Sequence, residues 1–260
     1  MAKNNWDKLK DYIKWRIKSV NAHGLHSPFM YRLATECFYD KTNYPEYKDL
    51  KKYEKQLKKN RKTIQVKDLG AGSQKFASKE RKISDISKIA GSSLKEMKFL
   101  YRLSRYFKPE NMLELGTSLG KSTLSLHLGH PIADFTSIEG DPAIFRIAQE
   151  NLKHTPVKFI QSDFEDYLNQ LPARQKFDFV YLDGNHTKEA TLRYFELLLP
   201  HLHNNSLLLL DDIYWSEEMK EAWKILKNHP RVKQSVDGFH KGFLFFREEQ
   251  FPQHFYIRLS

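Results

Sequence analysis

The chain has 260 residues and carries 43 lysines and arginines against 32 aspartates and glutamates, a formal net charge of +11. Its apolar content of 40% is enough to bury a core, which excludes a wholly disordered chain. No apolar run approaches the roughly 20 residues of a membrane-spanning helix, and the opening residues, MAKNNWDKLK, lack the pattern of an export signal. The single cysteine, Cys37, excludes an internal disulfide and a cysteine-rich zinc site. We therefore expect a soluble cytoplasmic protein.

The positive charge is concentrated in the first part of the chain. Residues 1–110 hold 27 basic and 12 acidic side chains, a net charge of 27 − 12 = +15. Residues 111–260 hold the remaining 16 basic and 20 acidic side chains, a net charge of −4. This division indicates an enzyme-like body that follows a basic front section.

Helical periodicity dominates the front section. Residues 5–20 predict an amphipathic helix whose apolar stripe comprises Trp6, Leu9, Ile13, Ile17 and Val20. We expect this stripe to pack on the main domain or on a second subunit, and a membrane surface is the alternative. Ser27 and Pro28 predict the start of another helix. For the nearby His23 and His26, a packed or capping role is favoured over metal binding.

A strongly basic helix is predicted over residues 48–62. Its apolar residues Leu50, Tyr53 and Leu57 share one face, so the lysines favour a solvated helix surface. A nucleic-acid-binding patch is the alternative.

From residue 106 onward, apolar runs alternate with helical segments. Five strands are predicted at 112–115, 135–139, 157–161, 177–183 and 206–212, with helices at 121–129, 142–153, 163–171, 188–202 and 216–228. A strand pair joined through Asp237-Gly238 follows, at 231–236 and 241–247. The pattern predicts an α/β fold: a Rossmann-like, doubly wound, mostly parallel seven-stranded sheet that ends in an antiparallel hairpin. We divide the chain into a helical N-terminal extension or cap, 1–105, and a main domain, 106–260.

Two glycine-bearing turns are candidates for a cofactor site. The segment DLGAGSQ (68–74) lacks the third glycine of a dinucleotide fingerprint and no apolar strand–helix–strand follows it. The segment MLELGTSLGKST (112–123) lies between a predicted strand and a helix, where the open edge of a parallel sheet binds ligands. Its spacing, Glu114-x-Gly116-x-x-x-Gly120, argues against NAD. The next strand ends in Glu139, which can accept hydrogen bonds from two ribose hydroxyls.

The segments MLELGTSLG, SIEGDP, IQSDFEDYL, FDFVYLDGNH and LLLLDDIYW, in this order, resemble class I S-adenosylmethionine-dependent methyltransferases. The pattern is most similar to the catechol- and caffeoyl-CoA-type O-methyltransferases and to uncharacterised bacterial relatives. The resemblance covers roughly residues 95–247 and makes 106–260 a domain that binds S-adenosyl-L-methionine.

The resemblance implies the cofactor contacts. Those at the methionine end would be Glu114, Gly116, Thr117, Ser118, Gly120 and Ser122. Glu139 would hold the ribose hydroxyls, with a helix N-terminal acid as the alternative role. Ser162 and Asp163 would meet the adenine. Asp183 would close the site near the methionine amino group.

Two further groups of residues suggest chemistry. Asp183, Asp211 and Asp212 lie at predicted strand ends and could converge on Mg²⁺ or another divalent cation. In the metal-dependent relatives the third ligand is Asn, where this chain has Asp212, and capping of the turn is the alternative role for the Asp211–Asp212 pair. His186 stands where the catechol enzymes have a general-base lysine, and imidazole gains and loses its proton near neutral pH. A helix-start histidine bonded to the backbone is the alternative.

These observations predict an S-adenosylmethionine-dependent methyltransferase that acts on oxygen of a small molecule, with His186 and Asp183 as catalytic residues. The basic section 1–105 would cap the pocket, form a homodimer contact, or attract an anionic acceptor. One alternative is an RNA methyltransferase that docks through this section. Another is a non-catalytic scaffold that binds S-adenosylmethionine. Tyr214 and Trp215 would form either an aromatic substrate wall or part of the core.

Overall fold

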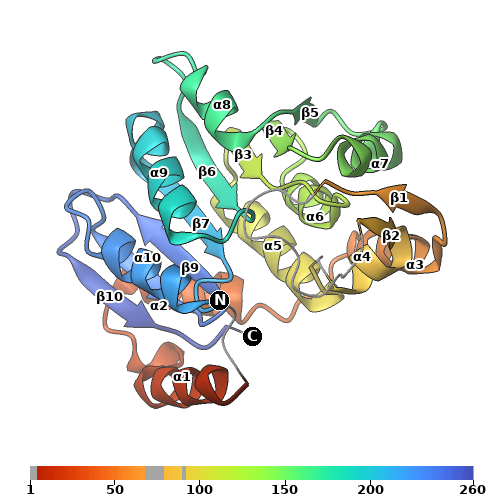
Figure 1. Ribbon diagram of the computed structural model, residues 1–260. Helices are drawn as coiled ribbons and strands as arrows, with labels where there is room; N and C mark the ends of the chain where they lie inside the picture. The colour runs from red at the N-terminus through yellow and green to blue at the C-terminus, as the bar shows by residue number, and fades with distance from the viewer. Residues whose placement is uncertain (1–4, 68–78, 90–91, 260) are drawn as a thin grey trace. The chain divides into compact units, whose positions relative to one another are not determined.

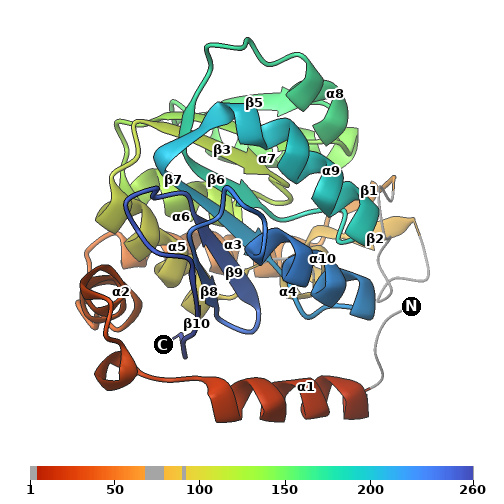
Figure 2. The same ribbon diagram turned by 90° about the vertical axis from the view of Figure 1, so that its left-hand side faces the viewer.

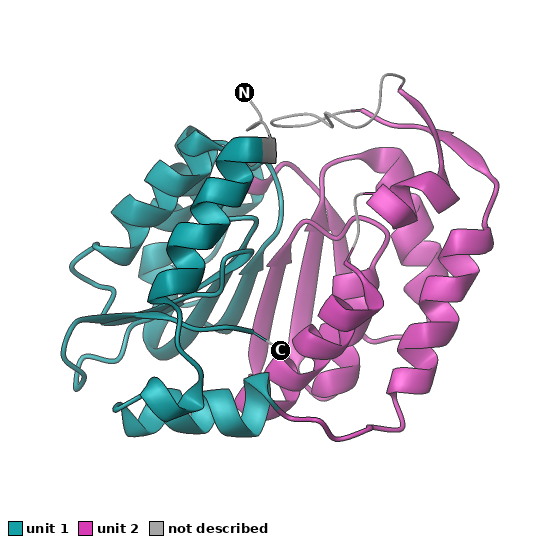
Figure 3. Cartoon of the chain, turned by 90° about the horizontal axis from the view of Figure 1, so that it is seen from below, with its two compact units in different colours: residues 1–39, 165–260 teal, residues 40–164 magenta. Residues whose placement is uncertain are grey.

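The computed structural model describes residues 5–67, 79–89 and 92–259 (Figure 1). The segment DLGAGSQ lies outside the described residues. The chain folds into two units, which Figure 3 shows in different colours. Unit 1 comprises Met1–Tyr39 and Glu165–Ser260, and unit 2 comprises Asp40–Phe164. The predicted domain boundary near residue 105 stays a prediction.

Unit 2 contains three strands of the main sheet and the helices between them. Its elements are α3 (Tyr47–Lys59), β1 (Thr63–Gln65), β2 (Glu80–Lys82), α4 (Ile83–Ile89), α5 (Leu94–Phe107), β3 (Asn111–Leu115), α6 (Lys121–Gly129), β4 (Asp134–Glu139), α7 (Pro142–Leu152) and β5 (Lys158–Gln161). Strands β3, β4 and β5 pair in parallel, with Leu115 opposite Ile138 and Glu139 opposite Gln161. This register brings the carboxyl ends of the three strands to one edge of the sheet.

Unit 1 contains the remaining strands of the main sheet. Its elements are α1 (Asn5–Lys18), α2 (Pro28–Leu33), α8 (Phe164–Asn169, in this unit from Glu165 on), β6 (Phe177–Leu182), α9 (Lys188–Leu198), β7 (Leu202–Asp211), α10 (Glu217–Lys227), β8 (Gln234–Asp237), β9 (Lys241–Phe245) and β10 (Gln253–Tyr256). Strands β6 and β7 are parallel, and β9 runs antiparallel to both β7 and β8.

Among the described residues, the strand order is β10-β8-β9-β7-β6 in unit 1 and β3-β4-β5 in unit 2. The predicted α/β class, the mostly parallel sheet and the closing antiparallel hairpin are confirmed. The structure adds one strand to the predicted seven, because β10 pairs in parallel with β8. Only four residues long and half exposed, β10 has no apolar run that would announce a strand. In the described part of the chain, no helix has both the length and the apolar character to cross a membrane.

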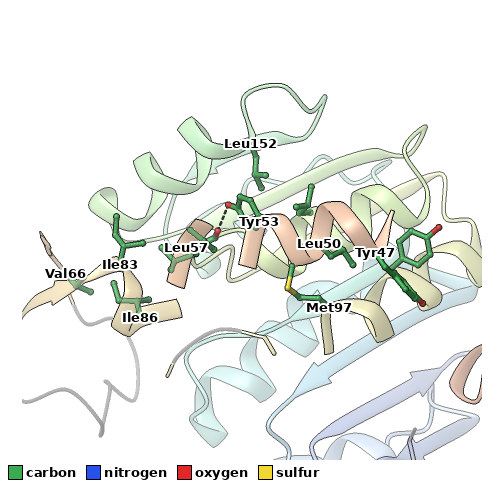
Figure 4. Close-up of a cluster of buried hydrophobic side chains, with 12 residues drawn as sticks. Tyr47, Leu50, Tyr53, Leu57, Val66, Ile83, Ile86, Met97 and Leu152 are labelled. Carbon is green, nitrogen blue, oxygen red and sulfur yellow. Dashed lines mark hydrogen bonds between the residues drawn. The ribbon is translucent and has the colours of Figure 1, made fainter. Parts of the chain in front are cut away.

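The basic helix α3 is held by its apolar face. Leu50, Tyr53 and Leu57 are buried in the core of unit 2, where Figure 4 shows them among side chains from α4, α5 and α7. The Tyr53 hydroxyl donates a hydrogen bond to the carbonyl of Leu119, at 2.7 Å. The core side of α3 therefore matches the predicted face, and Lys51, Lys52 and the other lysines of the run are exposed.

Helix α1 confirms the predicted helix but not its predicted packing. The other prediction in this region is confirmed, because Ser27 caps the N-terminus of α2, with Pro28 at its first position. In α1, Trp15 and Asp11 are buried against unit 1, and the apolar stripe Trp6, Leu9, Ile13 and Ile17 faces outward. The predicted packing on the main domain is therefore wrong for these four residues, whereas Val20, beyond the end of α1, pairs with Ile257. A polar and aromatic face docks the helix instead. Packing of the stripe on a second subunit stays a prediction.

Asp237, at the end of β8, anchors several elements of unit 1. Its carboxylate accepts hydrogen bonds from the hydroxyl of Tyr214 (2.9 Å), Nε1 of Trp223 (3.1 Å) and the backbone N–H of Phe239 (3.0 Å). Its backbone carbonyl accepts the Nε1–H of Trp15 at 3.0 Å. Because Asp237 is buried, these donors form hydrogen bonds with its oxygens instead of with water.

Replacing Asp237 with Ala should lower the free energy of unfolding by about 3 kcal/mol, because three donors that are buried or partly buried lose their acceptor at about 1 kcal/mol each. Asp237→Asn keeps one acceptor oxygen and should cost about 1 kcal/mol. Urea unfolding of both variants measures the difference. Equal losses for Ala and Asn would show that the carboxylate oxygens do not anchor these elements.

Candidate active site

The glycine turn between β3 and α6 has the geometry that the sequence predicts. Gly116 and Gly120 both adopt positive φ, at 113° and 75°, where side-chain-bearing residues are strained. A Cβ atom on Gly120 would lie 2.6 Å from Cδ1 of Leu152 in α7. Gly120 is therefore required both for the backbone conformation at the start of α6 and for the close approach of α7.

Glu114, on β3, is a fully buried carboxylate whose two oxygens have different surroundings. Oε2 accepts hydrogen bonds from the hydroxyls of Thr123 (2.5 Å) and Ser137 (2.6 Å). Oε1 is buried and has no hydrogen-bond partner among the described residues. Burial raises the pKa of Glu114 to about 7, although the hydroxyls of Ser122, Ser137 and Thr123 partly offset the rise. A buried carboxylate oxygen without a donor suits a ligand that carries a cationic amine.

Glu139 links the end of β4 to the glycine turn. One oxygen accepts the backbone N–H of Ser118 at 2.8 Å, and the other accepts the backbone N–H of Asp141 at 2.9 Å. Burial raises the pKa of Glu139, against the lowering effect of these backbone donors. The carboxylate is thus fixed at the sheet edge with lone pairs left for a ligand.

The alternative role for Glu139, that of an acid at the N-terminus of a helix, is filled by Asp141. Asp141 caps α7 by accepting the backbone N–H groups of Ala143 (2.8 Å) and Ile144 (2.7 Å). The cap position is therefore filled, and the fold of α7 does not explain why an acid ends β4.

The other cofactor-site candidates of unit 2 occupy different surroundings. Thr117 is buried, and its hydroxyl is 2.6 Å from that of Ser137, so its side chain supports Glu114 through Ser137. Ser122 is buried in the first turn of α6. At the end of β5, Ser162 donates its backbone N–H to the carbonyl of Glu139 at 3.2 Å, and Asp163 is exposed. The assignment of each residue to a part of the cofactor stays a prediction.

In unit 1, Asp183 and Asp211 lie at the ends of neighbouring strands, and both contact the hydroxyl of Tyr181. The hydroxyl of Tyr181 is 3.1 Å from Oδ2 of Asp183 and 2.8 Å from Oδ2 of Asp211. Nζ of Lys241, on β9, donates to Oδ1 of Asp211 at 2.7 Å and to the Tyr181 hydroxyl at 3.3 Å. Asp212 follows with a φ of 51° and donates its backbone N–H to Oδ1 of Asp211.

Charge in this cluster is divided unevenly. Burial and the charge of Asp211 raise the pKa of Asp183 well above its usual range. Burial acts in the same direction on Asp211, but the ammonium of Lys241 outweighs it, so the pKa of Asp211 is lowered. Burial and Asp211 also raise the pKa of Asp212. Lys241 is thus the cation that neutralises Asp211.

The donor set of the cluster does not fit a divalent cation. The ammonium of Lys241 already contacts one oxygen of Asp211, and a metal ion bound there would lie beside a like charge. Among the described residues, no three His, Cys, Asp or Glu side chains are grouped so that they could hold a metal. The predicted metal site at Asp183, Asp211 and Asp212 therefore gains no support and stays a prediction.

His186 lies beside Asp183, with 3.6 Å between its Nε2 and Oδ1 of the carboxylate. Thr187, not His186, caps α9, because its hydroxyl accepts the N–H of Ala190. Asn185 donates from its side chain to the Tyr194 hydroxyl at 2.8 Å, which ties the loop to α9. Thr187 thus performs the capping function that the alternative role of a helix-start histidine would give to His186.

Backbone strain coincides with the predicted sites. Six described residues other than glycine have positive φ, and four of them lie in these segments: Ser118, Asn185, His186 and Asp212. Such conformations cost about 1 kcal/mol or more and persist where surrounding structure requires them. Their concentration at the strand ends supports a functional role for these loops.

Tyr214 and Trp215 contribute to packing. The Tyr214 ring stacks on Phe239 with 4.7 Å between centroids, and its hydroxyl bonds Asp237. Nζ of Lys8, on α1, lies 4.7 Å from the ring centroid of Trp215. Of the two predicted roles, the contacts of Tyr214 are those of a core residue.

Four supporting residues were missed from the sequence: Thr123, Ser137, Tyr181 and Lys241. Strand alternation could have identified Tyr181, because it lies two positions before Asp183 and so on the same face of the chain. Lys241 could not have been found this way, because its contact with Asp211 depends on the β7–β9 register, which pairs the two residues directly.

Comparison with known proteins shows what the chain is similar to. Residues 113–213 match a family model described as a methyltransferase domain. No curated protein matches the chain. A methyltransferase from Podospora anserina, solved with S-adenosylhomocysteine, shares 18% identity at a TM-score of 0.61 over 86% of this chain and 97% of its own. An O-methyltransferase from Bacillus cereus, also solved with S-adenosylhomocysteine, shares 21% identity at a TM-score of 0.52 over 60% of this chain and 82% of its own.

A third similar structure, a candidate caffeoyl-CoA O-methyltransferase from Staphylococcus aureus, shares 15% identity at a TM-score of 0.53 over 62% of this chain and 88% of its own. At these identities the structures show a shared fold. Together with the match to a methyltransferase domain over residues 113–213, they confirm the predicted resemblance to the class I S-adenosylmethionine-dependent methyltransferases.

Proposed function

We propose that this chain, which carries a class I methyltransferase domain, transfers a methyl group from S-adenosylmethionine to an oxygen of a small-molecule acceptor. The observation that carries the proposal is the edge formed by β3 and β4 in unit 2. There, a buried carboxylate oxygen of Glu114 has no hydrogen-bond partner in the described part of the chain, and Glu139 is fixed against the turn at Ser118. One of the similar structures is an O-methyltransferase and another is a candidate caffeoyl-CoA O-methyltransferase, which supports oxygen as the acceptor atom.

Glu114 and Glu139 suit different parts of this cofactor. Oε1 of Glu114 would accept a hydrogen bond from the methionine ammonium, which satisfies the unpartnered oxygen. Glu139 would accept hydrogen bonds from the ribose hydroxyls. Ser118 would present its backbone to the cofactor at the same turn. Ser162 and Asp163, which follow the end of β5, would contact the adenine.

The chemistry requires alignment and removal of one proton. When bound, S-adenosylmethionine supplies a methyl group on a sulfonium sulfur; the acceptor oxygen forms a bond to this carbon as the sulfur–carbon bond breaks. His186 would take the acceptor proton. Since Nε2 faces Asp183, Nδ1 is the atom that receives it. Asp183 orients the imidazole, as a positioned carboxylate does for a histidine base.

Calorimetric titration tests the proposal directly. The protein is titrated with S-adenosylmethionine and S-adenosylhomocysteine, with and without Mg²⁺, and with NADH as the control. Micromolar binding of the two sulfur compounds but not NADH supports the proposal, and the absence of binding refutes it. Because Lys241 neutralises Asp211, we expect binding and subsequent turnover to be unchanged by Mg²⁺ or by a chelator.

Binding of S-adenosylhomocysteine should depend on the protonation of Glu114. The pKa of Glu114 is raised to about 7 in the free protein, and a bound ammonium would favour the ionised form. Binding at pH 6.5 should therefore release roughly 0.7 proton, and affinity should be about eightfold weaker at pH 6 than at pH 7.5. Calorimetry in buffers of different ionisation enthalpy measures the release.

The raised pKa of Glu114 also makes the stability of the folded state depend on pH. A carboxyl whose pKa is raised on folding stabilises the folded state below its unfolded pKa, and this contribution is lost as pH rises through about 7. The variant Glu114→Gln is the control, because it cannot ionise. Proton release that is unchanged in Glu114→Gln would contradict the assignment of Glu114 to the ammonium.

The basic section 1–105 is proposed as a cap or homodimer contact, and its charge would attract an anionic acceptor. Turnover of a small phenol would exclude a non-catalytic scaffold. Salt-sensitive RNA binding, with turnover on RNA alone, would establish the RNA methyltransferase instead.

A further inference from the structure

Helix α1 presents an apolar ridge to the exterior of unit 1. Figures 1 and 2 show α1 at the periphery of this unit. Trp6 is 72% exposed, Leu9 47%, Ile13 49% and Ile17 80%. These residues follow one another at intervals of three and four positions, which places them along one side of a helix. Four large apolar side chains in one exposed row form a continuous surface.

The opposite side of α1 is fixed to unit 1, so the ridge cannot turn inward without losing that docking. Trp15 packs against Phe239 with 5.5 Å between ring centroids and donates its Nε1–H to the carbonyl of Asp237. Tyr12 lies edge-on to the same Phe239 ring at 5.2 Å. Asp11 accepts a hydrogen bond from Nζ of Lys220 at 2.8 Å. The orientation of the helix is therefore determined by specific contacts.

Basic side chains border the ridge on both sides. At 100° per residue, Lys10 and Lys14 lie on one side of the ridge and Arg16 lies on the other, and all three are exposed. The acidic residues of the helix are Asp11, which faces unit 1, and Asp7, whose carboxylate is 3.9 Å from Nζ of Lys10. The exposed side thus combines an apolar centre with a net positive border.

We propose that α1 binds the surface of an anionic lipid membrane, with the ridge inserted between lipids and its basic border on the headgroups. An apolar ridge flanked by lysine and arginine is the pattern of helices that lie in the membrane interface, and Trp6 is of the residue type favoured at that depth. A second copy of the chain fits less well. A twofold contact between ridges would bring the same basic borders together.

Vesicle sedimentation with the full chain tests this proposal. Binding should be roughly tenfold or more stronger to phosphatidylcholine vesicles that contain a third phosphatidylglycerol than to pure phosphatidylcholine vesicles, and should weaken with added salt. The double variant Ile13→Gln/Ile17→Gln removes apolar surface without changing charge, and it should reduce binding roughly tenfold. Ile132→Gln is the matched control, because Ile132 is an 84% exposed isoleucine outside α1.

Each outcome has one interpretation. Binding to anionic vesicles that falls in the double variant and persists in Ile132→Gln supports the membrane surface. Absence of binding to anionic vesicles overturns the proposal, as does binding that the double variant leaves unchanged. Sedimentation velocity without lipid, run on the same proteins, shows whether the ridge instead holds two copies together. Thermal unfolding of the variants confirms that α1 remains docked. The proposal does not depend on the methyltransferase activity.

Discussion

Replacing Glu139 with Ala should weaken binding of S-adenosylhomocysteine roughly a hundredfold or more. A carboxylate that accepts hydrogen bonds from two ribose hydroxyls loses two charge-assisted bonds, each contributing about 1.5–3 kcal/mol. The structure adds a second cause, because the same carboxylate fixes the turn by accepting the backbone N–H of Ser118. Calorimetric titration of wild type and variant measures the loss.

Two further variants separate ligand contact from support of the turn. Glu139→Gln retains one acceptor oxygen and similar volume, so its affinity should fall between those of the wild type and Glu139→Ala. Glu110→Ala, which removes an exposed carboxylate from the same unit, should bind as the wild type does. If Glu139→Ala binds with unchanged affinity, the ribose assignment is wrong. Adenosine, which carries the ribose without the amino acid, should show the same loss.

Replacing His186 with Ala should lower turnover roughly 10²- to 10⁴-fold, the range typical of a lost general base. Affinity for S-adenosylhomocysteine should change by no more than about twofold, because no cofactor contact is assigned to this ring. Turnover is measured as S-adenosylhomocysteine formation with an acceptor selected from a panel of catechols and other phenols. Added imidazole should restore part of the lost rate.

The pH profile distinguishes a base from a residue that merely supports the loop. If His186 is the base, the pH profile of turnover should differ between the wild type and His186→Ala. His26→Ala, at an exposed histidine of the same unit, is the matched control. Unchanged turnover in His186→Ala, or a lower rate with an unchanged pH profile, would remove His186 as the base.

The sequence by itself determined the order of strands and helices between residues 106 and 247 and the position of the turn at Gly116 and Gly120. These features are local: apolar runs bounded by turn residues specify strands, and positive φ requires glycine at Gly120. The sequence also identified Glu139 as the acid that ends β4. It could not distinguish ligand binding from helix capping for this residue, because either role requires only an acid near a helix start.

The tertiary structure decided the features that depend on residues far apart in the chain. Asp141 rather than Glu139 caps α7, since only the folded turn shows which carboxylate reaches the free N–H groups. Lys241 meets Asp211 through the antiparallel register of β7 and β9. Helical periodicity located the apolar stripe of α1, but Trp15 and its contacts with Phe239 and Asp237 decided which side docks. Periodicity fixes which residues share a face, and only long-range contacts determine where that face points.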